Sequence, residues 1–442
     1  MCICLSVYFG RSVVLKRIVP TILILCVSAT FLYARSEALA ERYLQLFLRG
    51  SFYLANEMQS VKVRKDYTVD DMQKELERLR ENYGNYLFIF STETSEIRGY
   101  TVYIFHSQFE KGYIDFNIVI DNFGKVDAFV VQPTLQPGAI PDYIDTSRFD
   151  EFEITIGSDR WKLPGVLTVP KNLDRYPLVI LIHDSGALDR DSTIGPNKPF
   201  RNIAWGLATR GVAVMRYDKR TFVFGEKLSQ ASPSIETEII EDVMNAVNMA
   251  SKMPAVSSIF LVGHGLGGKI APIVAARNEN VDGIVLMGTS ARRELQVIID
   301  RQNYVSELFY SDRERQQLKL LIDYLQKALD GKLLPGTPVL AATAGYYYEI
   351  DALDPIETIK KLNIPVLILQ GGADYESTTD DYMTFMNSLW TSLNVYFQLF
   401  PNLDHYFMPV EREKSTPDDY YEFRHVDREL VESLFSWIFV FN

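Results

Sequence analysis

The chain has 442 residues, of which 47% are hydrophobic and 23% charged, and its formal net charge is -12. This composition is typical of a globular protein and excludes a mainly disordered, collagen-like or coiled-coil chain. The acidic balance argues against a nucleic acid as the main partner, because binding a phosphate backbone requires a basic surface.

The first segment is typical of an export signal. Lys16 and Arg17 precede an uncharged run, 18–34, which Arg35 closes. The run has the minimum length for crossing a bilayer, which takes about 17–25 residues. We therefore expect residues 1–35 to be a signal peptide or signal anchor, the protein to be exported, and any membrane contact to go through this segment alone.

All three cysteines lie in this leader, as Cys2, Cys4 and Cys26. The rest of the chain therefore has no disulfide framework, no zinc–thiolate site and no cysteine nucleophile.

The next region predicts a small α+β domain over residues 36–132. Residues 36–59 are expected to be helical, and a second helix follows Thr68, a good N-cap residue. After Gly84 the apolar residues alternate with period two, which indicates strands. The expected strands are 86–90, 100–105, 114–120 and 126–131. Prolines then mark a linker over residues 133–147.

From residue 148 onward the pattern predicts an α/β domain that reaches residue 442. Two short strands come first, and apolar runs then alternate with helical segments, which is typical of a mostly parallel sheet covered on both faces. The short strands are 152–156 and 166–169, and the runs are 178–182, 212–215, 259–262, 283–287, 366–369 and 395–399. Residues 291–350 interrupt this pattern as a helical insertion, expected to form a cap. Ligands of such sheets bind at the carboxyl ends of the strands.

Three strand ends carry residues suited to hydrolysis. Gly263–Gly268 follows the third run and matches G-x-S-x-G except that Gly265 stands in place of the serine. Asp374 follows the fifth run, and His405 comes after the last. The order of elbow, acid and histidine is that of the α/β-hydrolases.

These motifs together resemble the secreted carboxylesterases of the α/β-hydrolase superfamily that carry an H-G-S-G-x-x-D-R-D oxyanion loop. The loop stands here as residues 183–191, and the R-Y-D-K-R segment of that family stands as residues 216–220. The region 36–132 resembles the NTF2-like domain that often precedes such hydrolases.

The resemblance implies a Ser-His-Asp mechanism on a small-molecule ester or acyl compound, with no cofactor and no metal. A serine at position 265 would attack the carbonyl, His405 would carry its proton, and Asp374 would orient the imidazole. Backbone N–H groups of Leu266 and of the loop at Ser185 and Gly186 would stabilise the oxyanion.

Three residues depart from the family pattern. Gly265 has no hydroxyl, so an acyl-enzyme cannot form there. Asp184 replaces a glycine of the oxyanion loop, where a carboxylate opposes a developing oxyanion unless it points away. Asp404 stands before His405 where asparagine is common. We therefore expect an impaired or non-catalytic protein. A nucleophile elbow also has a disfavoured backbone conformation, which glycine adopts freely.

Two alternatives stay open at this point. His405 and Asp374 could activate a water in the space left by the serine and give a slow esterase, since the remaining site still accelerates hydrolysis. Residues 263–268 also match G-x-G-x-x-G, a dinucleotide-binding pattern. That minor alternative lacks the acidic residue expected after the next strand, 283–287.

Overall fold

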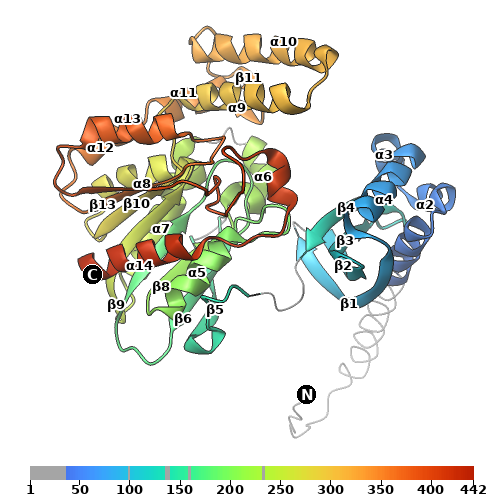
Figure 1. Cartoon of the computed structure of the whole chain (residues 1–442), viewed down its shortest axis with the longest axis horizontal. Coiled ribbons are helices and arrows are strands. Elements are labelled where there is room, and N and C mark those ends of the chain that lie inside the picture. The colour runs from blue at the N-terminus through green and yellow to red at the C-terminus, as the bar shows by residue number, and fades with distance from the viewer. Residues whose placement is uncertain (1–35, 98–99, 135–139, 158–160, 231–233) are drawn as a thin grey trace, which may run out of the picture. The chain divides into compact units, whose positions relative to one another are not determined.

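The computed structural model of the chain describes residues 36–97, 100–134, 140–157, 161–230 and 234–442. The chain divides into two compact units, residues 1–136 and 137–442 (Figure 1). The predicted leader, 1–35, lies outside the described residues. Among the residues that are described, no helix combines the length and the apolar character needed to cross a membrane.

The N-terminal unit begins with helices that pack on an antiparallel sheet. A helix over residues 36–48 ends before Gly50, whose φ is +75°, so the helical region expected over residues 36–59 consists of two helices rather than one. Thr68 caps the longest helix through a capping box with Asp71, as its sequence predicts. The further helices are α2 (Phe52–Met58), α3 (Val61–Asp66) and α4 (Val69–Tyr83).

Four strands pair in chain order in this unit. They are β1 (Tyr86–Ile97), β2 (Tyr100–Phe109), β3 (Gly112–Ile120) and β4 (Val126–Thr134). Their buried side chains and those of α4 form one core. Because β4 continues to Thr134, Pro133 belongs to the sheet, and the linker expected from residue 133 begins later.

The C-terminal unit contains an eight-stranded sheet. Its strands are β5 (Phe149–Ile156), β6 (Leu163–Pro170), β7 (Tyr176–Ile182), β8 (Ala213–Tyr217), β9 (Val256–His264), β10 (Gly283–Met287), β13 (Val366–Gly371) and β14 (Val395–Phe400). The spatial order is β14-β13-β10-β9-β7-β8-β6-β5. Strands β5 and β6 are antiparallel to their neighbours, and all others pair in parallel, so the predicted fold class is confirmed.

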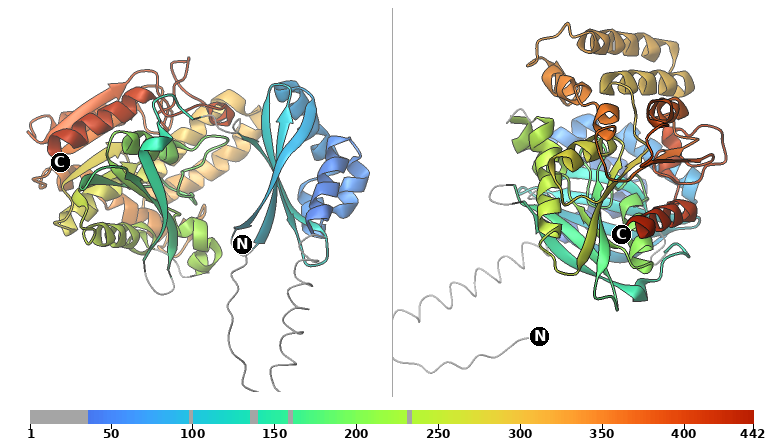
Figure 2. Two further views of the ribbon diagram at one scale, coloured as in Figure 1. Left: turned by 90° about the horizontal axis from the view of Figure 1, so that it is seen from below. Right: turned by 90° about the vertical axis from the view of Figure 1, so that its left-hand side faces the viewer.

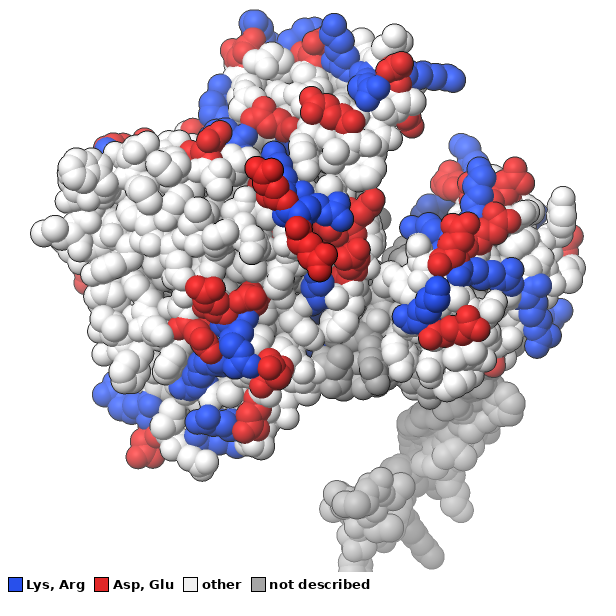
Figure 3. Space-filling view, viewed as in Figure 1, with Lys and Arg blue, Asp and Glu red and all other residues white. Residues whose placement is uncertain are grey.

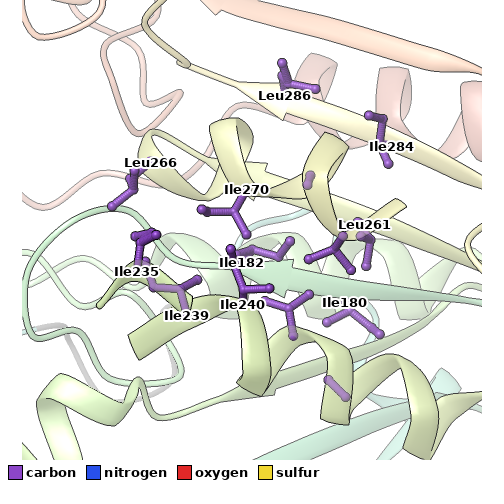
Figure 4. Close-up of a cluster of buried hydrophobic side chains, with 14 of the residues drawn as sticks. Ile180, Ile182, Ile235, Ile239, Ile240, Leu261, Leu266, Ile270, Ile284 and Leu286 are labelled. Atoms are coloured by element: carbon purple, nitrogen blue, oxygen red, sulfur yellow. The ribbon is translucent and has the colours of Figure 1, made fainter. Parts of the chain in front are cut away.

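Helices cover both faces of this sheet, which explains its continuous apolar runs. Along β7, Ile180 and Ile182 face one core layer, whereas Val179 and Leu181 face the other. The first layer includes the helices α7 (Glu241–Ala250), α8 (Leu266–Arg277) and α13 (Thr379–Leu389), and the second includes α5 (Pro199–Thr209) and α14 (Arg428–Phe441). Figure 4 shows side chains of the first layer between β7 and α8.

The insertion at 291–350 forms a helical layer of its own (Figures 1 and 2). It consists of α9 (Glu294–Phe309), α10 (Asp312–Leu329), the short strands β11 (Pro338–Val339) and β12 (Ala342–Thr343), and α11 (Ala344–Asp351). Ser311 begins α10 with a capping box through Glu314. On the face shown in Figure 3, acidic and basic side chains are mixed on this layer.

Candidate active site

The elbow lies between β9 and α8, and its backbone has a conformation that glycine adopts without strain. Gly265 has φ +52° and ψ -115°, a region that residues with a side chain rarely adopt. Its N–H donates to the carbonyl of Met287 on the neighbouring strand, with an N···O distance of 3.0 Å. The expectation that this position has a conformation suited to glycine is therefore confirmed. The turn between β9 and α8 therefore has the form of a nucleophile elbow, with a glycine at the position where such a turn carries the nucleophile.

Asp374 and His405 are brought together at the carboxyl ends of β13 and β14. The distance from His405 Nδ1 to Asp374 Oδ2 is 2.7 Å, and both side chains are almost fully buried. The other oxygen of Asp374 accepts hydrogen bonds from the N–H groups of Glu376 and Ser377. The carboxylate is therefore fixed on one side, and it holds the imidazole with Nε2 facing the elbow.

Asp184 points into the site rather than away from it. Its Oδ1 accepts hydrogen bonds from the N–H groups of Leu266 and Ser185, at 2.7 and 2.6 Å. Its Oδ2 lies 3.2 Å from Nε2 of His405. A Cβ atom added to Gly265 would lie only 2.1 Å from Oδ1. The carboxylate therefore occupies the space that a serine side chain would need, and it takes the N–H donors expected to bind the oxyanion.

The other two residues of the predicted oxyanion loop lie at the surface. Ser185 and Gly186 are exposed where they line the cavity described below, and Gly186 has φ +92°. The carbonyl of Gly186 accepts a hydrogen bond from the hydroxyl of Thr221 at 2.9 Å. Of these two residues, it is Ser185 that donates its backbone N–H to Asp184, next to the N–H of Leu266.

The two charged motifs that the sequence singled out hold this loop together. Arg190 binds Asp218 through its Nε and Nη2 atoms, each at 3.0 Å, and Arg216 binds Asp191 at 2.9 Å. The ammonium group of Lys219 donates to the carbonyl of Asp184 at 2.9 Å. Each motif thus supplies the partners of the other, which fixes the backbone of Asp184.

Asp404, the third departure from the family pattern, does not line the cavity described below. Its side chain is fully buried and pairs with Arg424 at 3.0 Å. Its Oδ1 accepts from the N–H groups of Tyr406 and Met408. The substitution therefore shapes the loop that carries His405 and does not face a ligand.

The charges around His405 keep its ring protonated. Burial alone would lower the pKa of His405, but the carboxylates of Asp374, Glu376 and Asp184 outweigh it and raise the pKa well above its usual value. Burial would likewise raise the pKa of Asp184, but His405 and the Leu266 N–H hold that pKa well below its usual range. The site is a chain of two carboxylates joined by an imidazolium.

These shifts determine how the site contributes to stability at different pH values. Since the pKa of His405 is higher in the folded state, its contribution is complete below about pH 6.5 and is lost as pH rises through the raised value. The contribution of Asp184 has the opposite sign. It is present above about pH 4 and is lost as pH falls through the lowered pKa.

We predict that Asp184→Asn lowers the pKa of His405, because it removes one of the carboxylates that favour the charged ring. The measurement is a titration of the ring nitrogens by ¹⁵N NMR between neutral and alkaline pH. In the parent protein, His405 should stay protonated through neutral pH. Equal titration curves in the two proteins would show that Asp184 does not pair with the imidazole.

A cavity of about 540 Å³ lies over this site. Its floor includes Gly265, Leu266 and His405, and its roof comes from the helical insertion. The roof is largely apolar, with Val297, Ile298, Leu321, Leu325 and Ile350. A cavity of this size, apolar with a few polar groups, is typical of small-molecule sites.

Several charged residues of the cavity were not predicted from the sequence. Arg301 pairs with Glu376 at 2.6 Å, and Lys269 pairs with Glu294 at 3.2 Å. Arg301 and Glu294 come from α9, inside the insertion, so only the folded chain brings them to the strand ends. No motif in the sequence marks them.

The sheet order, the positive-φ turn after β9 and the Asp374–His405 pair define the C-terminal unit as an α/β-hydrolase domain. Residues 198–329 match the family described as serine aminopeptidase, S33, and residues 40–129 match a family described as a protein of unknown function, DUF3887. Over 397 residues the chain is 33% identical to the esterase EstD of Thermotoga maritima, a match covering 90% of this chain and 93% of that protein. The chain therefore belongs to the esterase family that includes EstD.

Solved structures with similar folds are more distant. Est1E from Butyrivibrio proteoclasticus is 16% identical, with a TM-score of 0.44 over 65% of this chain and 98% of Est1E. A dienelactone hydrolase from Anabaena variabilis is 14% identical, with a TM-score of 0.41 over 66% of this chain and 99% of the hydrolase.

Proposed function

We propose that this member of the esterase family binds a small ester or acyl compound in the cavity under its cap and does not cleave it through an acyl-enzyme. The observation that supports this most directly is the position of Asp184. A glycine stands at the nucleophile position, and the neighbouring carboxylate lies 2.7 Å from the Leu266 N–H that would otherwise stabilise an oxyanion. Attack at this point lacks both the hydroxyl and a free donor.

The charges in the cavity indicate an uncharged ligand. Glu294, Glu376 and Asp184 are each paired with a cation, namely Lys269, Arg301 and His405. A charged ligand would have to break one of these pairs or lie unpaired beside them, which is costly away from water. The apolar roof favours an alkyl or aryl chain.

Slow hydrolysis through a water activated by His405 has weaker support. A general base needs an unprotonated Nε2, and here that nitrogen faces the carboxylate of Asp184 at 3.2 Å. The raised pKa of His405 leaves the ring charged at neutral pH. The base is therefore blocked by the same side chain that fills the nucleophile position.

The test is turnover of short-chain p-nitrophenyl esters together with labelling by a fluorophosphonate probe. We expect no labelling and no turnover above that of the variant His405→Ala. Turnover that His405→Ala abolishes, in a variant that stays folded, would contradict a purely binding role and support the water mechanism. Strong labelling would show that another serine is activated.

We also propose that the protein is exported, on the strength of the basic residues and the uncharged run before Arg35. The test is fractionation of cells that express the full chain with a C-terminal tag. Recovery of the tag in the secreted or membrane fraction is expected. Recovery only with the cytosolic proteins would contradict export.

A further inference from the structure

The same residues that close the site to ester cleavage have the ligand types of a metal centre. One ring nitrogen of His264, one of His405 and one carboxylate oxygen of Asp184 all lie within 4.8 Å of one another. Asp184 follows β7, His264 ends β9 and His405 follows β14, so the three residues come from separate strand ends. Two imidazoles and a carboxylate are a common ligand set for zinc and other divalent transition metals.

His405 already has the support that metal-binding histidines have. Its Nδ1 is held by Asp374 at 2.7 Å, which leaves Nε2 to face Asp184. A carboxylate behind the ring of a ligating histidine orients it and increases its basicity. The distance of 3.2 Å between Nε2 and Oδ2 of Asp184 is close to the about 3.3 Å that separates two ligands of a tetrahedral ion at bond lengths of about 2.0 Å.

His264 provides an independent observation. Its side chain is buried, with an exposed fraction of 2%. Its Nε2 lies 2.8 Å from the carbonyl oxygen of His405 and donates to it, because a carbonyl can only accept. Its Nδ1 is therefore an acceptor, and it is buried with no hydrogen-bond partner among the residues that the structure describes. A buried acceptor without a partner requires an explanation, and a bound ion is one.

The charge in the site also suits a divalent ion. Three carboxylates surround the ring of His405, namely Asp374, Asp184 and Glu376, and Arg301 neutralises one of them. A proton on His405 adds one positive charge and leaves the group with a net charge of about -1 by this addition. A divalent ion in place of that proton would bring it to about zero.

From this arrangement we infer that Asp184, His264 and His405 bind one divalent transition-metal ion, such as Zn²⁺, on the floor of the cavity. Asp184 Oδ2 and His405 Nε2 would be ligands, and Nδ1 of His264 would complete the protein set, with the remaining position open to the cavity. The inference shares Asp184 and His405 with the proposed function, and the outcomes below distinguish the failure of one from the failure of the other.

The experiment is calorimetric titration of the full chain with zinc chloride after chelator treatment and dialysis. Cysteine thiolates are good zinc ligands in general, so the titration uses the variant in which Cys2, Cys4 and Cys26 are serine. We expect one equivalent to bind and to raise the midpoint of thermal unfolding. Cobalt chloride should give the visible absorption of a low-coordinate Co²⁺ complex.

Two variants and one matched control assign the ligands. Asp184→Asn keeps the size of the side chain, and His264→Gln keeps a donor for the carbonyl of His405. Each should weaken zinc binding about 10-fold or more, by comparison with the loss seen when supporting groups of metal sites are removed. His106→Gln is the control, because His106 lies beside Asp115 and Glu93 in the other unit and forms a rival histidine–carboxylate group.

The possible results distinguish failure of the metal site from failure of the binding role. No binding by the parent, or binding that neither Asp184→Asn nor His264→Gln weakens, would overturn the inferred site. Loss of binding in His106→Gln would move the site to the N-terminal unit and overturn it equally. If the zinc-loaded parent hydrolyses esters while the metal-free parent does not, the result supports the metal site and contradicts the purely binding role. If zinc binds and no turnover is seen, the result supports both the metal site and the binding role.

Discussion

The double variant Asp184→Gly/Gly265→Ser is expected to hydrolyse short-chain p-nitrophenyl esters at least about 10³-fold faster than the parent, since loss of the nucleophile alone costs a serine hydrolase roughly 10⁶-fold in kcat. The physical reason is that the turn, the acid and the histidine are already placed. Asp374 holds His405 at 2.7 Å, and the Leu266 N–H becomes available to an oxyanion once the carboxylate is gone. The measurement is kcat/KM together with fluorophosphonate labelling.

The single variants test why both changes are needed. Gly265→Ser alone places a side chain within 2.1 Å of Asp184 Oδ1, so the two groups compete for one space. Competition for the Leu266 N–H should hold its kcat about 10²–10³-fold below that of the double variant. Asp184→Gly alone has a free donor but no hydroxyl and should stay inactive. A single Gly265→Ser variant as active as the double variant would contradict the role assigned to Asp184.

A serine at position 265 also affects stability. The φ of +52° at this position is disfavoured for any residue with a side chain, by about 1–3 kcal/mol. The double variant should therefore be less stable than the Asp184→Gly single variant by that amount in urea denaturation. Equal stability would show that the turn relaxes when serine is introduced.

Lys219→Met is expected to destabilise the C-terminal unit by about 3–5 kcal/mol, the cost of leaving one member of a buried ion pair alone. Lys219 and Glu238 are 3% and 6% exposed and lie 3.2 Å apart. The methionine would also release the carbonyl of Asp184, which Lys219 binds at 2.9 Å. Urea denaturation of the parent and the variant measures the loss.

Lys360→Met provides the matched control for this prediction. Lys360 pairs with Glu357 at 2.6 Å, but both side chains are about half exposed. Such surface pairs contribute about 0–1 kcal/mol, so this variant should unfold close to the parent. Adding Glu238→Gln to Lys219→Met should recover part of the lost stability, because it removes the unpaired charge. A loss below about 1 kcal/mol in Lys219→Met would contradict the buried pair.

The sequence was sufficient for the architecture of the C-terminal unit. Its continuous apolar runs correspond to the parallel strands because both faces of that sheet are buried, as the two layers around β7 show. The position of Gly265 on a strand-to-helix turn follows from the glycine pattern around it. The helix end before Gly50 was missed even though a glycine is a common stop signal, because the apolar pattern continues past it into the next helix.

The content of the site depended on contacts distant in sequence. Asp184 could have pointed toward solvent, and only the folded chain places its carboxylate against Leu266 and His405, which are 82 and 221 residues away in sequence. Likewise, Asp404 is adjacent to His405 in sequence yet pairs with Arg424 away from the cavity. The direction in which a side chain points depends on the residues packed around it, and a sequence motif does not identify those residues.

The competition between position 265 and Asp184 has a consequence for engineering this site. A Cβ atom at position 265 would lie 2.1 Å from the Asp184 carboxylate, so any side chain placed there requires the carboxylate to move. The present position of Asp184 and a hydroxyl at position 265 therefore exclude each other. A design that introduces a nucleophile has to treat the two positions as one unit.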